Sequence, residues 1–204
     1  MPVIVVANPK GGVGKTTLST NIAGYYASRG NKVMLGDVDR QQSARTWLGL
    51  RPPNLATISP WEIAHDEVVR PPKGTTHVVL DTPAGLHGWR FKEVLALADR
   101  VIVPLQPSIF DIYATRDFLD RLLEQRKAEK TKIGLVGMRV NARTLAADRL
   151  NEFIAGLGVP VLGELRDTQN YVQLAARGLT LFDIAPGRVQ RDLEQWQPIC
   201  EWLD

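Results

Sequence analysis

A short glycine-rich segment near the start of the chain carries the clearest chemical signal. Residues 3–17 read VIVVANPKGGVGKTT, an apolar β-branched run followed by glycines, a lysine and two threonines. Gly11, Gly12 and Gly14 can adopt backbone angles that direct consecutive amide N–H groups toward one anion. The helix expected to begin near Thr16 adds the positive end of its dipole. The segment therefore predicts a binding site for phosphate groups.

The polar side chains of this segment indicate a nucleotide together with Mg²⁺. Lys15 can reach the β- and γ-phosphates, and the Thr16 hydroxyl can ligate Mg²⁺. The usual motif has a glycine where Pro9 stands, and Lys10 follows it, so two lysines flank one phosphate site. We expect the nucleotide contacts of this segment to come from Gly11, Gly12, Val13, Gly14, Lys15, Thr16 and Thr17.

Two later apolar runs end in acidic residues. Residues 32–39 read KVMLGDVD and residues 78–81 read VVLD. Ligands of open α/β sheets bind at the carboxyl ends of the strands, so we expect these acids to lie near the phosphate loop. For Asp37 two interpretations stay open, a direct role in the site and a cap on nearby backbone amides.

Apolar runs alternate with stretches of helical period, which is typical of a parallel sheet covered on both faces. We predict an α/β fold with a doubly wound, mostly parallel sheet, in one domain over residues 1–204. The predicted strands are Val3–Ala7, Lys32–Gly36, His77–Leu80, Val101–Pro104, Ile133–Val140 and Pro160–Leu165. The predicted helices begin near Thr16, Trp61, Phe91, Asp111, Leu145, Asn170 and Val189.

The composition excludes several classes of protein. The chain has 204 residues, of which 44% are hydrophobic and 23% charged, as in ordinary globular domains. Cys200 is the single cysteine, so neither an internal disulfide nor a thiolate metal cluster can form within the chain. The apolar runs fall far short of the ~20 residues that cross a bilayer, and the first residues do not read as a secretory signal. We expect a cytoplasmic protein.

The sequence KGGVGKTT resembles the deviant Walker A motif of the ParA/MinD superfamily of P-loop ATPases. The resemblance runs from Val3 to about Asp183 and is nearest to the small, ParF-like partition ATPases. It implies ATP and ADP as ligands, Mg²⁺ as the metal, and Lys10 and Lys15 as catalytic residues. In this family the first lysine, here Lys10, reaches the phosphates of a partner in an ATP-sandwiched homodimer. Because a lysine can act in trans only when two copies face each other, ATP and dimer formation stabilise one another.

The same resemblance assigns roles to residues farther along the chain. Asp39 takes the place of the acid that orients the attacking water, although Arg40 replaces the proline that usually follows. Asp81 is similar to the Walker B carboxylate, which holds Mg²⁺ through water. The resemblance thus implies a metal site at Thr16, Asp39 and Asp81. Asn141 is either a contact of the adenine or ribose, or a cap of the helix that follows it.

Small members of this family bind nonspecific DNA as ATP dimers, and a ParB-like activator or cargo adaptor stimulates hydrolysis. The resemblance therefore implies a nucleoid-associated ATPase that positions a plasmid, a chromosome or a large protein cargo. Residues 130–191 hold nine Lys and Arg against five Asp and Glu, a charge of +4 that suits contacts with DNA phosphates. The candidate contacts are Arg143, Arg166, Arg177, Arg188 and Arg191.

Two other functions stay open. A MinD-like membrane ATPase needs a basic amphipathic helix at its C-terminus, and apolar residues from Val189 to Leu203 do recur at helical spacing. However, residues 192–204 hold four acids and no base, and Pro198 interrupts the pattern, so we expect this helix to pack into the core and a membrane partner to be absent. The second alternative is a nucleotide-locked scaffold that dimerises with ATP and scarcely hydrolyses it.

Overall fold

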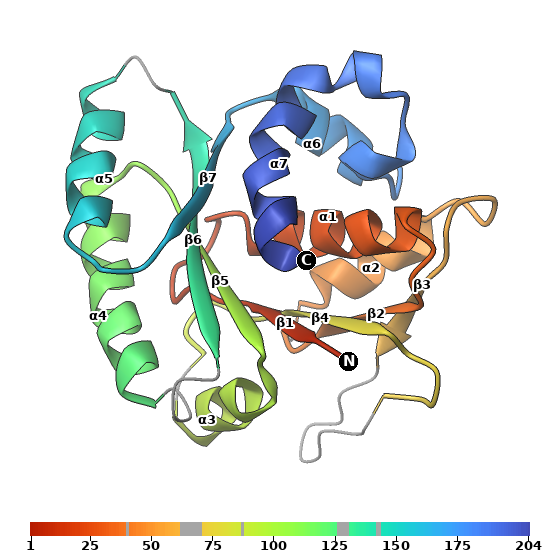
Figure 1. Cartoon of the computed structure of the whole chain (residues 1–204), viewed down its shortest axis with the longest axis horizontal. Helices are drawn as coiled ribbons and strands as arrows, with labels where there is room; N and C mark the ends of the chain where they lie inside the picture. Colours follow the sequence, from red (N-terminus) through yellow and green to blue (C-terminus); the bar gives the residue numbers. More distant parts are fainter. Residues whose placement is uncertain (40, 62–70, 87, 126–130, 142–143) are drawn as a thin grey trace.

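The computed structural model describes residues 1–39, 41–61, 71–86, 88–125, 131–141 and 144–204. These residues form a seven-stranded sheet in the order β3-β2-β4-β1-β5-β6-β7, with every neighbouring pair parallel (Figure 1). The strands are β1 (Val3–Val6), β2 (Val33–Asp37), β3 (Ile58–Trp61), β4 (His77–Asp81), β5 (Arg100–Leu105), β6 (Lys132–Val140) and β7 (Val161–Arg166). The predicted fold class is confirmed.

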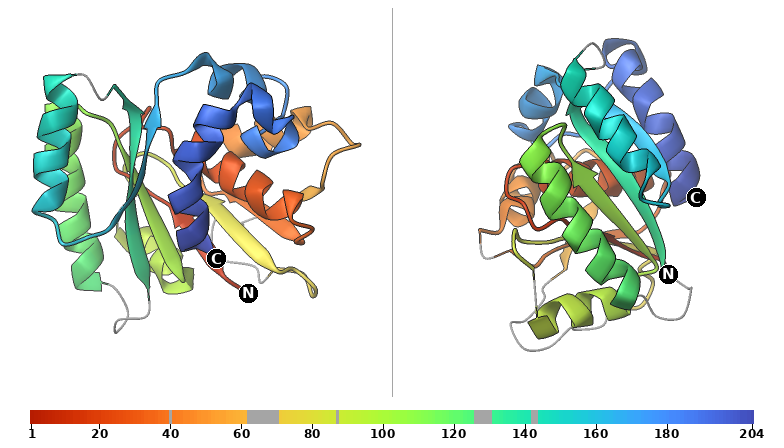
Figure 2. Two further views of the ribbon diagram at one scale, coloured as in Figure 1. Left: turned by 45° about the horizontal axis from the view of Figure 1, so that its top comes forward. Right: turned by 90° about the vertical axis from the view of Figure 1, so that its left-hand side faces the viewer.

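Helices cover both faces of the sheet. One face is covered by α3, α4 and α5, and the other by α1, α2, α6 and α7 with the short 3-10 turns η1 and η2 (Figure 2). The helices are α1 (Lys15–Ser28), α2 (Ser43–Leu50), α3 (Gly88–Leu97), α4 (Ile109–Gln125), α5 (Leu145–Ala155), α6 (Gln169–Ala175), η1 (Leu181–Asp183), η2 (Pro186–Arg188) and α7 (Gln190–Leu203).

The central strand β1 shows why these apolar runs form strands of this kind. Ile4 and Val6 belong to the core on the α1 side, whereas Val3 and Val5 belong to the core on the α4 side. All four are at most 7% exposed. Successive side chains of a strand point to opposite faces, so a strand buried on both faces reads as a continuous apolar run. The phosphate loop begins where this central strand ends.

Two elements differ from the prediction. The helix predicted near Trp61 is wrong at its start, because Trp61 is the last residue of strand β3; residues 62–70 lie outside the described part of the chain. Pro60 obscured this strand in the sequence, but β3 lies at the edge of the sheet, where a residue without an N–H is tolerated. Helix α2 had no counterpart among the predicted helices.

The C-terminal helix α7 packs into the core, as predicted, but the expected interruption at Pro198 is wrong, because the helix is continuous from Gln190 to Leu203. Trp196, Ile199 and Leu203 are at most 1% exposed and belong to the core on the α1 side. Its end is tied to α1, because the Tyr26 hydroxyl donates to the Leu203 carbonyl over 2.9 Å. The apolar face of α7 is therefore occupied by the protein interior. Within the described residues, no helix is long and apolar enough to span a bilayer.

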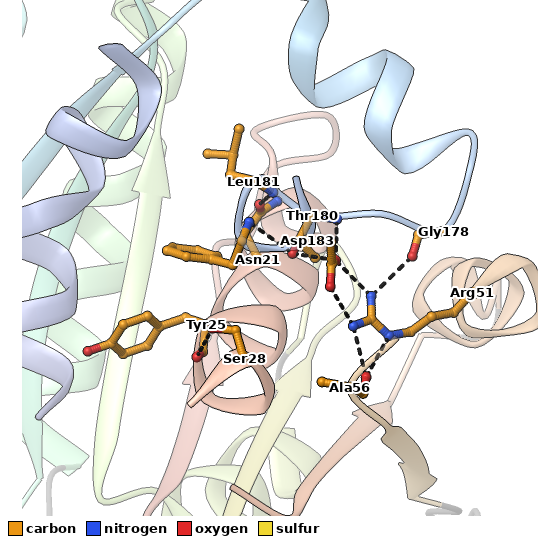
Figure 3. Close-up of polar contacts among 10 residues, drawn as sticks. Asn21, Tyr25, Ser28, Arg51, Ala56, Gly178, Thr180, Leu181 and Asp183 are labelled. Carbon is orange, nitrogen blue, oxygen red and sulfur yellow. Dashed lines mark hydrogen bonds and ion pairs between the residues drawn. The ribbon is translucent and has the colours of Figure 1, made fainter. Parts of the chain in front are cut away.

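A buried ion pair fixes the end of α2 to the segment that follows α6 (Figure 3). The Arg51 guanidinium donates to both carboxylate oxygens of Asp183, over 2.8 and 2.9 Å, and both side chains are at most 6% exposed. Asp183 also accepts hydrogen bonds from the amide and the hydroxyl of Thr180. The Nε of Arg51 donates to the Ala56 carbonyl. Gly178, at φ 66°, leaves no room for a Cβ against the backbone of Arg51.

We expect Asp183→Ala to lower the free energy of unfolding by about 3–5 kcal/mol, because it leaves the buried Arg51 charge without its partner. Burial raises the pKa of Asp183, but the hydrogen bonds from Arg51 and Thr180 and the Arg51 charge outweigh it, so the net pKa is lowered. This stabilisation is therefore present above the unfolded-state pKa of about 3.9 and is lost as the pH falls through the lower folded-state value.

Denaturant unfolding at neutral and acidic pH measures both effects. The matched control is Asp167→Ala, which removes an exposed acid nearby and should change stability by no more than about 0.5 kcal/mol. A loss for Asp183→Ala no larger than that of the control would contradict the importance of the ion pair.

Candidate nucleotide-binding site

The loop between β1 and α1 has the backbone conformation of a phosphate cradle. Gly12 and Gly14 have φ angles of 75° and 97°, in the left-handed region that favours glycine. At Gly14 a Cβ would also lie 2.6 Å from the Met138 side chain. Helix α1 starts directly afterwards at Lys15, so its unpaired N-terminal amides face the loop. The glycine spacing seen in the sequence thus has a conformational cause.

Three contacts brace this loop from the surrounding elements. The buried Asn8 side chain donates to the Pro104 carbonyl over 2.7 Å and accepts from the Lys10 amide over 2.8 Å. Gln106, just after β5, donates from its side chain to the Gly12 carbonyl over 2.9 Å. Sequence reasoning missed Asn8 and Gln106, since nothing in their local pattern reveals a partner a hundred residues away. These contacts within the protein fix the position of the loop.

Lys15 lies inside the loop. Its Nζ donates to the Lys10 carbonyl over 2.6 Å, and the residue is 8% exposed. Burial lowers the pKa of Lys15, and the charges of Asp81 and Asp39 counteract that change. A phosphate group in the loop would add negative charge beside this ammonium and favour its charged form.

The acidic residues meet this loop at the carboxyl edge of the sheet. Asp81 of β4 pairs in register with Val6 of β1 and with Asp37 of β2. The Asp81 carboxylate accepts hydrogen bonds from the Thr16 hydroxyl over 2.6 Å and from the Ser19 hydroxyl over 3.2 Å. The predicted convergence of the strand-end acids on the phosphate loop is therefore observed.

The surroundings of Asp81 favour the binding of a cation. Burial and, to a smaller extent, the charge of Asp37 raise the pKa of Asp81. The hydrogen bonds from Thr16 and Ser19 lower it, and the net pKa is about 7. The Thr16 hydroxyl, the Asp81 carboxylate and the Asp39 carboxylate are hard oxygen donors. Mg²⁺ typically takes one or two carboxylates together with water and substrate phosphates. The residues present therefore fit this metal.

Asp37 and Asp39 have different environments although they lie two residues apart. One Asp37 oxygen accepts from the Asp39 amide over 2.9 Å, and the other accepts from the Ala44 and Arg45 amides over 2.8 and 3.3 Å. Asp37 thus caps the first turn of α2, which is the local-cap interpretation. Asp39 accepts from the Gln41 amide over 3.0 Å and lines the cavity above the phosphate loop.

A cavity of about 550 Å³ opens above the loop, between Asp39 on one side and Pro83 and Ala84 on another. Arg139 also lines it. This residue lies at an irregularity of the β6–β7 pairing and has a φ of 53°, which is rare for a residue other than glycine. Sequence analysis missed Arg139, because a bulge inside a strand leaves no clear signal in its residue pattern.

Lys10 lies outside its own phosphate site. Its Nζ is 3.8 Å from a carboxylate oxygen of Asp111, in the first turn of α4, and its side chain is 40% exposed. The two lysines that flank the glycines therefore point to different places, Lys15 into the loop and Lys10 toward the surface.

Asn141, Arg143 and Arg191 are three further predicted residues. Asn141 is exposed and does not line the cavity. Arg139, two residues before it, does. Its role stays a prediction. Arg143 lies outside the described residues. Arg191, in the first turn of α7, is exposed.

The other candidate arginines have contrasting surroundings. Arg166 forms an ion pair with the fully buried Asp192, with 2.6 Å between Nε and the carboxylate. Arg177 and Arg188 are exposed and line one hollow of about 260 Å³, beside Asn170 and Gln173. The structure thus gathers two of the five candidates at one surface hollow and pairs a third, the partly exposed Arg166, with a buried carboxylate.

Comparisons with known proteins identify the family of the chain. The CbiA family, described as the CobQ/CobB/MinD/ParA nucleotide binding domain, matches residues 4–181. The chain is 29% identical over 199 residues to the maintenance of carboxysome distribution protein A of Halothiobacillus neapolitanus, covering 93% of this chain and 91% of the relative. It is 30% identical over 183 residues to the chromosome-partitioning ATPase Soj of Thermus thermophilus, covering 72% of this chain and 73% of Soj.

A solved structure supports the same fold. The cell division ATPase MinD of Pyrococcus furiosus superposes with a TM-score of 0.74 over 98% of this chain and 99% of MinD, at 17% sequence identity. At that identity the likeness concerns the fold alone. The parallel sheet and its covering helices are those of the MinD and ParA P-loop proteins.

Proposed function

Because the chain belongs to the CobQ/CobB/MinD/ParA nucleotide-binding family, we propose that it is an Mg²⁺-dependent ATPase that works as an ATP-dependent dimerisation switch. The observation that carries the proposal is the arrangement of the two lysines. Lys15 is buried within the phosphate loop, whereas Lys10 extends away from it to Asp111 near the surface. A lysine placed in this way can serve the phosphates of a facing copy better than those of its own loop.

The chain's own residues divide the work of binding and hydrolysis. The amides of Gly11–Thr17 and the Lys15 ammonium bind the phosphates of ATP or ADP, and Thr16, Asp39 and Asp81 would hold Mg²⁺. Bound there, Mg²⁺ would supply positive charge that offsets the negative charge of the phosphates. Asp39, on the wall of the cavity, orients the attacking water. Lys10 of the second copy supplies a further positive charge to the γ-phosphate.

Sedimentation of the purified chain with no nucleotide, with ADP–Mg²⁺ and with a slowly hydrolysed ATP analogue tests the switch. We expect dimers with the ATP analogue alone. A chain that is monomeric in all three conditions, or equally dimeric in all three, is not an ATP-dependent dimerisation switch. Measuring phosphate release on the same samples distinguishes a slow ATPase from a nucleotide-locked scaffold.

We further propose that the ATP-bound dimer binds nonspecific DNA through Arg177 and Arg188. It would thereby associate with the nucleoid. Both arginines line the same hollow, and the side-chain amide of Gln173, which also lines it, can donate to phosphate oxygens. Arg191 is exposed one residue into α7 and extends the surface. Arg166 is already engaged by Asp192, so the proposal rests on the other arginines.

We expect Arg177→Ala and Arg188→Ala each to weaken DNA binding to a similar extent for all sequences. Each change should also reduce the slope of log affinity against log salt by about 1, because one phosphate contact is lost. The matched control is Arg121→Ala, an exposed arginine of α4 on the opposite face of the sheet. Fluorescence anisotropy with random duplex DNA in saturating ATP measures both. An unchanged salt slope in both variants would remove these arginines from the interface.

The names of the relatives support a positioning role. One relative maintains carboxysome distribution and another partitions chromosomes, so we propose that this chain positions a plasmid, a chromosome or a large protein assembly. A ParB-like activator or cargo adaptor would then stimulate hydrolysis and release the ATPase from DNA. Because an ATPase of this kind completes its site only with a partner, we expect slow hydrolysis by the isolated chain.

A further inference from the structure

An apolar surface lies at the start of α4, and it contains Ile109, Phe110 and Tyr113. These side chains are 45%, 75% and 60% exposed, respectively. Residues separated by three or four positions share one side of a helix, so Tyr113 lies beside both of the others. Ile112, between them in sequence, is 8% exposed and packs into the core. The first two turns of α4 thus place three large apolar side chains on the surface.

This apolar surface adjoins the phosphate loop. Asp111, in the same turn, pairs with Lys10 of the loop at 3.8 Å, and Gln106, just before the helix, donates to the Gly12 carbonyl over 2.9 Å. Farther along α4, the Thr115 hydroxyl accepts from the Asn8 side chain over 3.0 Å. These contacts hold the first two turns of α4 against the loop, so two copies that face each other across their nucleotides would bring the two apolar surfaces to the same interface.

The charges at this surface favour a second copy of the chain as the occupant. Lys10 and Asp111 place one cation and one anion beside the exposed Phe110. An interface with two-fold symmetry uses the same patch on both copies, and therefore needs a patch that is complementary to itself. An apolar centre that lies beside Lys10 meets that requirement, because Lys10 of each copy then faces the bound phosphates of the other copy.

We propose that Ile109, Phe110 and Tyr113 form the apolar contact of the ATP-bound homodimer, with a second copy of this chain as its partner. The inference rests on the proposed dimerisation switch and names the surface that the switch buries. Aromatic side chains that become fully buried near the centre of an interface commonly dominate its affinity. In a two-fold dimer every substitution occurs twice, so its effect on the dimer dissociation constant is doubled on a logarithmic scale.

Sedimentation equilibrium of the full chain with a slowly hydrolysed ATP analogue and Mg²⁺ tests the surface. Phe110→Ser should raise the dimer dissociation constant about 100-fold, roughly tenfold for each copy. Phe110→Leu, which keeps an apolar side chain, should recover most of the affinity. The control is Val172→Ser on α6, which removes an apolar side chain of 58% exposure from another part of the molecule and should leave the constant unchanged.

Binding of a fluorescent ATP analogue at a protein concentration that keeps the chain monomeric shows whether each variant is folded with an intact loop. We expect all three variants to bind it within about twofold of the unmodified chain, because Phe110 and Val172 lie outside the phosphate loop. If the Phe110→Ser dimer were as stable as the unmodified dimer, the proposed apolar surface would be wrong, and the proposed dimerisation switch would be unaffected. If the unmodified chain stayed monomeric in saturating ATP analogue, both the proposed dimerisation switch and the proposed apolar surface would be wrong.

Discussion

Replacing Lys15 with alanine should weaken ATP binding on the order of 100-fold, because a charge-assisted contact of about 1.5–3 kcal/mol to the phosphates disappears. Lys15 is 8% exposed and its ammonium points into the loop, so bulk water cannot replace its charge well. The glycine amides and the start of α1 remain in the variant. The phosphates should therefore contribute much less to the residual affinity for ATP than they do in the unmodified chain. The ratio of ATP affinity to adenosine affinity should fall accordingly.

Equilibrium binding of ATP to Lys15→Ala and to a control variant measures this effect. Lys32→Ala is a suitable control, because Lys32 is an exposed lysine just before β2, on the opposite edge of the sheet from the loop. Thermal unfolding without nucleotide checks that both variants fold. If folded Lys15→Ala bound ATP with unchanged affinity, the assignment of residues 10–17 as the phosphate site would be wrong.

Replacing Asp39 with alanine should slow hydrolysis about 100-fold or more while ATP still binds and dimers accumulate. The Asp39 carboxylate lines the cavity and accepts a hydrogen bond from the Gln41 amide over 3.0 Å. From this wall of the cavity it can hold a water molecule in line with the γ-phosphate. The phosphate loop itself does not depend on Asp39, because Lys15 and the glycines are held by other contacts.

Phosphate release and sedimentation in ATP–Mg²⁺, measured on the same samples, separate the two parts of this prediction. Asp120→Ala is the control, since it removes an exposed acid from α4. Asp37→Ala makes an informative contrast, because it removes the cap of α2 and should lower stability by about 1 kcal/mol. An Asp39→Ala chain that stays monomeric in saturating ATP would contradict the assigned role in water activation.

The parts of the site that could be predicted from sequence are those fixed by local chemistry. The glycines, Lys15 and Thr16 are consecutive and need only the strand before them and the helix after them, so their pattern predicts their geometry. The convergence of Asp37 and Asp81 follows almost as directly, because both end strands of a parallel sheet. The order of those strands was not needed for this conclusion.

Other features depend on contacts between distant parts of the chain. Helix α2 is eight residues long, too short for its helical period to stand out in the sequence, and its cap comes from Asp37 in the preceding strand. The bulge that turns Arg139 into the cavity depends on the pairing of β6 with β7. The engagement of Arg166 by Asp192 joins β7 to α7. None of these arrangements can be found without knowing which elements are neighbours.

The most direct test of the proposed function is the binding of random-sequence duplex DNA by the purified chain, with no nucleotide, with ADP–Mg²⁺ and with ATP–Mg²⁺. Anionic liposomes are included as a competing partner. We predict that DNA captures the chain in ATP–Mg²⁺ alone and that liposomes capture it in none of the three conditions. Equal DNA binding in all nucleotide states, or capture by liposomes in place of DNA, would contradict a nucleotide switch that acts on the nucleoid.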